Sequence, residues 1–120
     1  MAHYENLPVY KAVYDLLLYV FRIGKNIQRD YRYTLGEDLK KRLFKILTLV
    51  YKANAALQKH TFIELAREEM VVVKLLLRVL CDLKQLSASA YAHAALLAES
   101  VSKQLVAWNK YCLQTNEQAG

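Results

Sequence analysis

The segment SASAYAHAALLAESVSKQLVAWNKYCL, from Ser87 to Leu113, decides the expected fold. Its apolar residues recur in steps of four and three, which is the spacing of the buried seam in an antiparallel helix bundle. The seam positions are Ala90, Ala94, Leu97, Val101, Leu105, Trp108 and Cys112. The helix is expected to start near Ser87 or Ser89. The segment therefore predicts a long helix, over about residues 88–113, that packs against other helices.

Three more helices are predicted upstream, over about residues 8–27, 34–57 and 61–86. The first follows Asn6, a candidate cap, and has Pro8 in its first turn. Each of the other two begins with threonine and has glutamate three residues later, which is the pattern of a capping box. The two boxes are Thr34 with Glu37 and Thr61 with Glu64.

The connections between these helices are expected to be short, at residues 28–33, 58–60 and 86–89. The chain has only three glycines and one proline, which argues against a fold rich in turns. Short connections place consecutive helices side by side and antiparallel. Residues 1–120 are therefore predicted to form one all-α domain, an antiparallel up-down-up-down four-helix bundle.

Two of the predicted helices carry more apolar surface than one bundle covers. Residues 70–86 are apolar on nearly every side, and such a helix must be covered on more than one side. The 34–57 helix has a core stripe of Leu39, Leu43, Ile46, Val50 and Leu57, and a second stripe of Phe44, Leu47 and Tyr51. This surplus predicts that the chain forms a homo-oligomer.

The net charge of +6 is concentrated in one part of the chain. Between Arg22 and Lys59 there are ten basic residues against three acids, whereas the rest of the chain has seven bases and eight acids. A localised excess of this kind favours a polyanionic partner.

Basic side chains gather on one face of two predicted helices. At about 100° per residue, the lysines of the 34–57 helix fall within about 40° of one another, opposite its core stripe. They are Lys41, Lys45, Lys52 and Lys59. The 61–86 helix has a similar cluster among valine, leucine and methionine, formed by Arg67, Lys74 and Arg78. An unpaired cation there is costly unless it faces water or an anion. Both clusters are candidate nucleic-acid-binding residues, with an ordinary solvated face as the alternative for the lysines.

The expected loop at residues 28–33 interleaves bases and rings, in the order Arg29, Tyr31, Arg32 and Tyr33. Such a loop can hold phosphates and stack bases. The alternative is that both tyrosines pack on the end of the bundle. Arg29 and Arg32 join the candidate nucleic-acid-binding residues on the first interpretation.

Catalytic patterns are missing from the sequence. The three histidines stand outside any HxxxH or ExxH context, and the three glycines are isolated, so neither a diiron bundle pattern nor a phosphate loop is present. The remaining helix acids are scattered rather than paired for acid–base work. We therefore expect no enzymatic activity, no metal site and no cofactor.

Several features favour a cytoplasmic protein without membrane contact. Cys81 and Cys112 lack CxxC spacing and lie in apolar helical segments, which predicts buried, reduced thiols. Residues 1–10 lack the basic and apolar regions of a signal peptide. The apolar run at residues 16–21 is far shorter than the ~20 residues of a membrane span.

The string YRYTLGEDLKKRLFKILTLVYKAN, from Tyr31 to Asn54, carries a family resemblance. An aromatic residue and T-L-G precede a basic amphipathic helix that ends in Ala-Asn. Further features follow in order: the pair Lys74 and Arg78, the string CDLKQLS, and the pair Ala107 and Trp108. Over most of residues 8–113 the chain resembles a family of small four-helix-bundle proteins. That family includes the ribosomal-RNA intervening-sequence proteins and the accessory variability determinant (Avd) proteins of diversity-generating retroelements.

The resemblance favours the Avd branch of this family. The intervening-sequence branch usually reads A-N-I-A-E-G after the second helix, whereas Ala55-Ala56-Leu57-Gln58 follows Asn54 here. An Avd protein is expected to be a non-enzymatic, barrel-like homopentamer. It binds RNA or DNA and associates with a reverse transcriptase in mutagenic retrohoming. The resemblance also assigns the family's basic pair on the third helix to Lys74 and Arg78.

A second function stays open on the residues alone. The chain is then a homo-oligomeric structural or protein-interaction bundle of the intervening-sequence type, with no nucleic-acid role. A steep salt dependence of binding to RNA or DNA separates the two hypotheses, because each displaced counterion adds to the slope.

Overall fold

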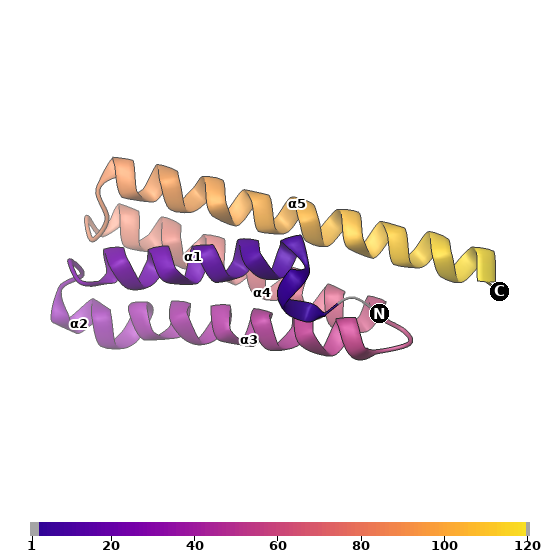
Figure 1. Ribbon diagram of the computed structural model, residues 1–120. Helices are drawn as coiled ribbons and strands as arrows, with labels where there is room; N and C mark the ends of the chain where they lie inside the picture. The colour runs from indigo at the N-terminus through magenta and orange to yellow at the C-terminus, as the bar shows by residue number, and fades with distance from the viewer. Residues whose placement is uncertain (1–2, 120) are drawn as a thin grey trace.

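Four long helices run lengthwise, each antiparallel to the next in the chain (Figure 1). They are α1 (Pro8–Gly24), α3 (Glu37–Ala55), α4 (His60–Asp82) and α5 (Ala88–Ala119). The computed structural model describes residues 3–119, and within them no strand is found. α1 and α4 each pack on both α3 and α5, so the four helices enclose a single core. The predicted all-α fold with four long helices is confirmed.

The core is built from one apolar stripe of each helix, and its largest fully buried side chains are aliphatic. They include Val13 and Leu16 of α1, Leu43 and Ile46 of α3, Met70 and Leu77 of α4, and Leu105 of α5. Leu57, which the sequence placed in the core stripe, is 95% exposed because α3 ends at Ala55. On α5 the buried positions include Ala98 and Asn109, while the predicted seam residues Leu97 and Trp108 are half-buried.

The connection after α1 differs from the expected loop at residues 28–33. A short helix α2 (Arg29–Tyr31) continues into a π-helical turn at Arg32–Gly36 and then into α3. The carbonyl of Gln28 starts this segment by accepting the amide hydrogens of Tyr31 and Arg32, at 3.0 and 2.8 Å. The prediction of a loop here was wrong, because the helical path begins eight residues before α3 itself.

Thr34 does not form the predicted capping box with Glu37. It lies inside the π-helical turn, and its hydroxyl donates to the carbonyl oxygen of Asp30 at 2.9 Å. A threonine hydroxyl can bond backward to a carbonyl within a helix, so the same residue fits a helix interior as well as a cap. The Glu37 carboxylate instead pairs with Lys40 at 3.7 Å.

The two other predicted caps are also absent. α4 begins at His60, so Thr61 lies within its first turn, and no side chain caps this helix. α1 is preceded by Leu7 in extended conformation, without a cap from Asn6, although Pro8 does take the first helical position. The start of α5 does have a side-chain cap, because Ser87 Oγ accepts the amide hydrogen of Ala90 at 3.0 Å.

α4 ends at Asp82, four residues earlier than predicted. The amide hydrogens of Lys84 and Gln85 bond back to the carbonyls of Cys81 and Leu80, at 3.0 and 2.9 Å. This pair of bonds is a Schellman motif, which normally places glycine in the left-handed position. Lys84 occupies that position here, with φ of 62°.

Lys59 closes the C-terminal end of α3. Its ammonium donates to the carbonyl oxygens of Ala53, Asn54 and Ala56, at 3.1, 3.0 and 2.8 Å. The last carbonyl groups of a helix lack the amide partner of a following turn, and a cation also suits the negative end of the helix dipole. Lys59 therefore stabilises the turn between α3 and α4 and does not belong to a free lysine stripe.

Candidate nucleic-acid interface

Two basic residues of α4 line a groove between α4 and α5. Arg67 and Lys74 share its wall with Glu64, Val71 and Val106, around a volume of about 290 Å³. Lys74 also borders a neighbouring hollow that contains Tyr91 and Glu99. Arg67 and Lys74 therefore line a groove on the surface of the single chain rather than the core.

Each of the three cations of α4, the two in the groove and Arg78 beyond it, has an acidic partner. The ion pairs are Arg67 with Glu64 at 2.6 Å, Lys74 with Glu99 at 3.1 Å, and Arg78 with Asp82 at 3.2 Å. Tyr91 and then Asp82 raise the pKa of Arg78 above its ordinary value, so it stays a cation. The three pairs sum to no net charge. The groove holds basic side chains, but its field is largely compensated, which the spacing of the cations alone did not reveal.

The lysines of α3 divide into paired and unpaired members. Lys45 binds Glu69 of α4 at 3.0 Å, and Arg42 binds the other carboxylate oxygen at 2.9 Å. Lys41 and Lys52 are exposed, and neither has a hydrogen bond or ion pair with any residue that the structure describes. Uncompensated positive charge on α3 therefore lies at Lys41 and Lys52.

The side chain of Glu69 is only 13% exposed, and two cations hold it. Burial raises the pKa of this carboxyl, but the hydrogen bonds from Lys45 and Arg42 outweigh that effect, and the pKa is lowered from its usual value. The pairing joins α3 to α4. The main structural role of Lys45 and Arg42 is therefore to hold α3 against α4 through Glu69.

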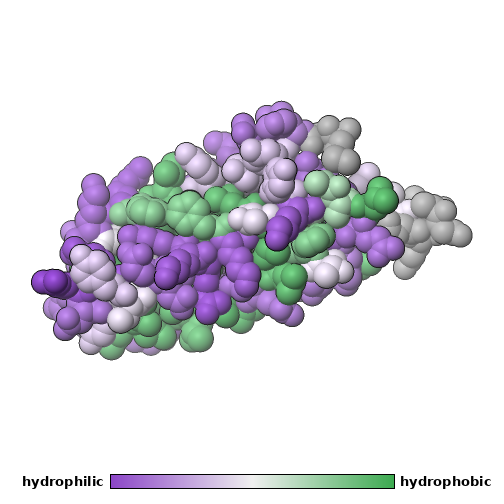
Figure 2. Space-filling view, turned by 90° about the horizontal axis from the view of Figure 1, so that it is seen from below, coloured by the Kyte–Doolittle hydropathy of each residue, from purple (hydrophilic) through white to green (hydrophobic). Residues whose placement is uncertain are grey.

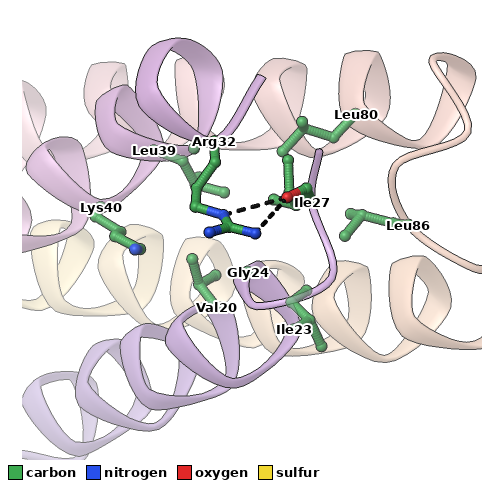
Figure 3. A pocket seen from close by; sticks show the side chains of 10 residues that line it. Val20, Ile23, Gly24, Ile27, Arg32, Leu39, Lys40, Leu80 and Leu86 are labelled. Atoms are coloured by element: carbon green, nitrogen blue, oxygen red, sulfur yellow. Dashed lines mark hydrogen bonds between the residues drawn. The ribbon is translucent and has the colours of Figure 1, made fainter. Parts of the chain in front are cut away.

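Arg32 stabilises the connection that follows α1 (Figure 3). Its guanidinium donates twice to the carbonyl of Ile27, at 3.2 and 3.0 Å, and once to that of Lys25, at 3.3 Å. The apolar hollow beside it, lined by Val20 and Leu80 among others, has a volume of about 10 Å³. This is about the least space that holds one water molecule, so it offers no ligand site.

Arg29 is exposed and lies over the ring of Tyr33, with 5.9 Å between the guanidinium carbon and the ring centre. Tyr33 is exposed, whereas Tyr31 is half-buried and packs against the core. The alternative that both tyrosines pack on the bundle end therefore holds for Tyr31 alone, whereas Arg29 and Tyr33 face outward.

A buried polar network at the other end of the bundle escaped the sequence analysis. Asn109 on α5 is only 6% exposed, and its Nδ2 donates to Glu64 Oε1 at 2.7 Å. Its Oδ1 faces His60 Nδ1 at 2.8 Å. An amide three residues before Cys112 and four after Leu105 is at seam spacing, and that was the signal that would have found it.

Two further findings bear on the class of protein. No group of three or more His, Cys, Asp or Glu side chains gathers in a metal-holding arrangement within residues 3–119. Among the helices that the structure describes, none combines the length and apolar character needed to cross a membrane.

The fold and its charged faces define a small four-helix bundle with basic side chains on the surfaces of α3 and α4. The sequence model of the family described as bAvd-like matches residues 8–112, and the chain belongs to that family. The match spans all four long helices except the last part of α5. A search of curated proteins finds no match. The family resemblance in the sequence is therefore confirmed.

Proposed function

We propose that this chain is an Avd-type accessory protein of a diversity-generating retroelement. It binds RNA or DNA without catalysing a reaction, and it associates with the element's reverse transcriptase during mutagenic retrohoming. The observation that carries the proposal is the family match over residues 8–112. The excess of ten bases over three acids between Arg22 and Lys59 supports a polyanionic partner.

The direct test is co-purification from cells that carry a complete retroelement. A tagged chain is expected to retain the reverse transcriptase through washes at moderate salt, and sequencing of the retained RNA identifies the bound transcript. Binding of purified chain to labelled RNA and DNA is expected to weaken steeply as salt is raised. The proposal would be refuted if the tagged chain retained no reverse transcriptase and the purified chain bound neither RNA nor DNA.

The proposal includes self-association through the outer face of α4. Leu65, Val71 and Leu75 are exposed there, and Leu75 is 59% exposed. Exposed aliphatic side chains along one helix favour a subunit contact, and the family resemblance implies a pentamer. Sedimentation equilibrium is expected to give an oligomer that Leu75→Lys dissociates. A monomeric wild-type chain at micromolar concentration contradicts this part.

One observation favours a second candidate, a homo-oligomeric bundle that contacts only protein. The cations of the α4–α5 groove are each neutralised by an acid, so this groove attracts phosphates weakly. A chain that oligomerises but binds neither RNA nor DNA at low salt would support this candidate.

A further inference from the structure

Aromatic side chains line a groove between α1 and α3. The groove has a volume of about 350 Å³, and its lining includes Tyr4, Tyr10, Tyr14, Phe44 and Tyr51. The buried side chains of Leu17 and Leu47 form part of its lining. Tyr14, Phe44 and Tyr51 are 46%, 51% and 51% exposed. Rings half-exposed along a hollow present both apolar surface and, for tyrosine, a polar tip.

The rings form a row along the bundle rather than one cluster. Tyr4 meets Tyr51 edge-on at 4.9 Å between ring centres, near one end of the groove. Phe21 meets Phe44 edge-on at 6.2 Å, further along. The helix rise places Tyr10 and Phe21 about 16 Å apart. At ~3.4 Å for each stacked nucleotide, this row matches about five nucleotides.

Unpaired lysines run beside the rings on α3. Lys41 is three residues before Phe44, and Lys52 is four residues after Thr48, so each is a neighbour of the groove on the helix surface. The two lysines are about 16 Å apart by the helix rise, the same length as the row of rings. Figure 2 views this side of the bundle and shows a hydrophilic band running lengthwise beside apolar side chains.

This combination differs from the exposed apolar surface of α4. There the exposed side chains are aliphatic, and the nearby cations are bound to acids. Along α1 and α3 the exposed apolar groups are rings, and Lys41 and Lys52 are free of partners within the described chain. Rings beside uncompensated cations are the pattern of surfaces that bind single-stranded nucleic acid.

We propose that the groove between α1 and α3 binds single-stranded RNA or DNA. Bases stack on Tyr14, Phe44 and Tyr51, and phosphates pair with Lys41 and Lys52. A duplex buries its base faces, so it reaches the lysines but not the rings. The inference rests on the proposed function, because it gives a surface and a strand preference to the nucleic-acid binding.

The first experiment removes rings and keeps apolar cover. Fluorescence anisotropy with a fluorescein-labelled 20-mer of thymidine measures affinity for the wild type and for Tyr14→Leu/Tyr51→Leu. We expect affinity about tenfold or more lower in the double variant, because each stacked base contributes about fivefold or more and the variant removes two rings. Tyr111→Leu is the control, since Tyr111 is an exposed ring on α5, and it is expected to bind as the wild type does.

The second experiment separates stacking from charge. Heparin is a polyanion without bases, so the double ring variant is expected to bind heparin as the wild type does. Lys41→Gln/Lys52→Gln is expected to weaken both probes and to lower the salt slope for the oligonucleotide by about 1.4, at ~0.7 for each lost phosphate contact. Lys103→Gln/Lys110→Gln removes the same charge from exposed α5 positions and is expected to leave that slope nearly unchanged.

The outcomes distinguish this inference from the proposed function. A wild-type chain that binds no nucleic acid at low salt refutes both. Wild-type binding that the ring variants retain refutes the groove alone, as does equal affinity for a 20-base-pair duplex. A change of oligomer mass in Tyr14→Leu/Tyr51→Leu, measured by sedimentation, makes the groove a subunit contact and overturns the inference.

Discussion

Asn109 donates from Nδ2 to Glu64 Oε1 across 2.7 Å, and this bond sets the roles of the neighbouring groups. A carboxylate only accepts hydrogen bonds, so the amide must turn its NH₂ toward Glu64. The Oδ1 of Asn109 then accepts from His60 Nδ1 at 2.8 Å, which requires a proton on that nitrogen. The same Glu64 oxygen accepts from Arg67 at 2.6 Å. Four side chains thus fix the register of α5 against α4.

Replacing Asn109 with leucine is expected to destabilise the fold. The leucine fills a similar volume but leaves Glu64 and His60 without their buried partner, which costs about 1–3 kcal/mol. Urea denaturation at pH 7 measures the free energy of unfolding. Gln114→Leu serves as the control, because Gln114 is an exposed amide on the same helix and is expected to change little. Equal free energies of unfolding for Asn109→Leu and the wild type would show that the network does not stabilise the fold.

Glu69 gives stability that depends on pH in a defined direction. Its folded-state pKa is lowered, chiefly because the hydrogen bonds from Lys45 and Arg42 outweigh the burial that raises it. Its contribution is therefore complete above the ordinary glutamate pKa and is lost as pH falls through the folded-state pKa. We expect Glu69→Gln to cost about 1–2 kcal/mol at pH 7, and the difference from wild type to shrink in urea titrations at acid pH.

A matched variant distinguishes this effect from general surface charge. Glu37 makes a longer pair with Lys40, at 3.7 Å, and its side chain is 43% exposed. Glu37→Gln is expected to change stability by less than about 0.5 kcal/mol at any pH. A Glu69→Gln deficit that stays constant from neutral to acid pH would assign the loss to packing rather than to ionisation.

The sequence predicted the number, order and approximate position of the long helices, because the apolar spacing is regular in all four. The helix starts were less predictable, since a Thr-x-x-Glu string fits a helix interior as well as a cap. Thr34 shows why: its hydroxyl bonds backward to the Asp30 carbonyl at 2.9 Å. The seam of α5 differs from the prediction at two positions, where Ala98 and Asn109 are buried in place of Leu97 and Trp108. Val101, Leu105 and Cys112 are buried as predicted.

The positions of the candidate basic residues on the helix faces were predictable from the sequence, but the electrostatic field around them was not. Helical spacing places Lys74 and Arg78 on one face, yet their acid partners arise in different ways. Asp82 is four residues from Arg78 on the same helix, whereas Glu99 reaches Lys74 from α5. A contact between residues 25 positions apart depends on how α4 and α5 pack, which spacing within one helix does not determine. The neutralisation of the groove therefore required the tertiary structure.

Lys84 offers a stabilising substitution. It holds the left-handed position after α4 with φ of 62°, where a side chain costs about 1–2 kcal/mol. Lys84→Gly removes that strain but makes the unfolded chain more flexible, so a net gain of about 0.5–1 kcal/mol is expected. Thermal or urea denaturation measures it. Lys84→Ala retains the side-chain strain and is expected to gain nothing, so equal gains in both variants would contradict this explanation.

Removing the acid partners of Lys74 and Arg78 tests the α4–α5 groove through an expected gain, rather than a loss, of nucleic-acid affinity. Asp82→Asn with Glu99→Gln removes both counter-charges and keeps both cations. Arg78 and Asp82 are more than half exposed, and Lys74 and Glu99 are also open to solvent, so each broken pair changes stability by less than about 1 kcal/mol. If Lys74 and Arg78 contact phosphates, the variant is expected to bind a labelled oligonucleotide more tightly. Its salt slope is expected to steepen by up to about 1.4, at ~0.7 for each added contact.

Gln114→Lys/Thr115→Lys adds the same charge on α5 and controls for a general increase in net charge. Gln114 and Thr115 are exposed and lie outside both the α4–α5 groove and the α1–α3 groove. A gain in oligonucleotide affinity confined to Asp82→Asn/Glu99→Gln places phosphates beside Lys74 and Arg78. The α4–α5 groove is then a binding site whose affinity is lowered by its own acidic side chains. Identical gains in the two double variants reflect long-range attraction only. In that case Lys74 and Arg78 act within their ion pairs, and the contacts that bind nucleic acid lie elsewhere on the bundle.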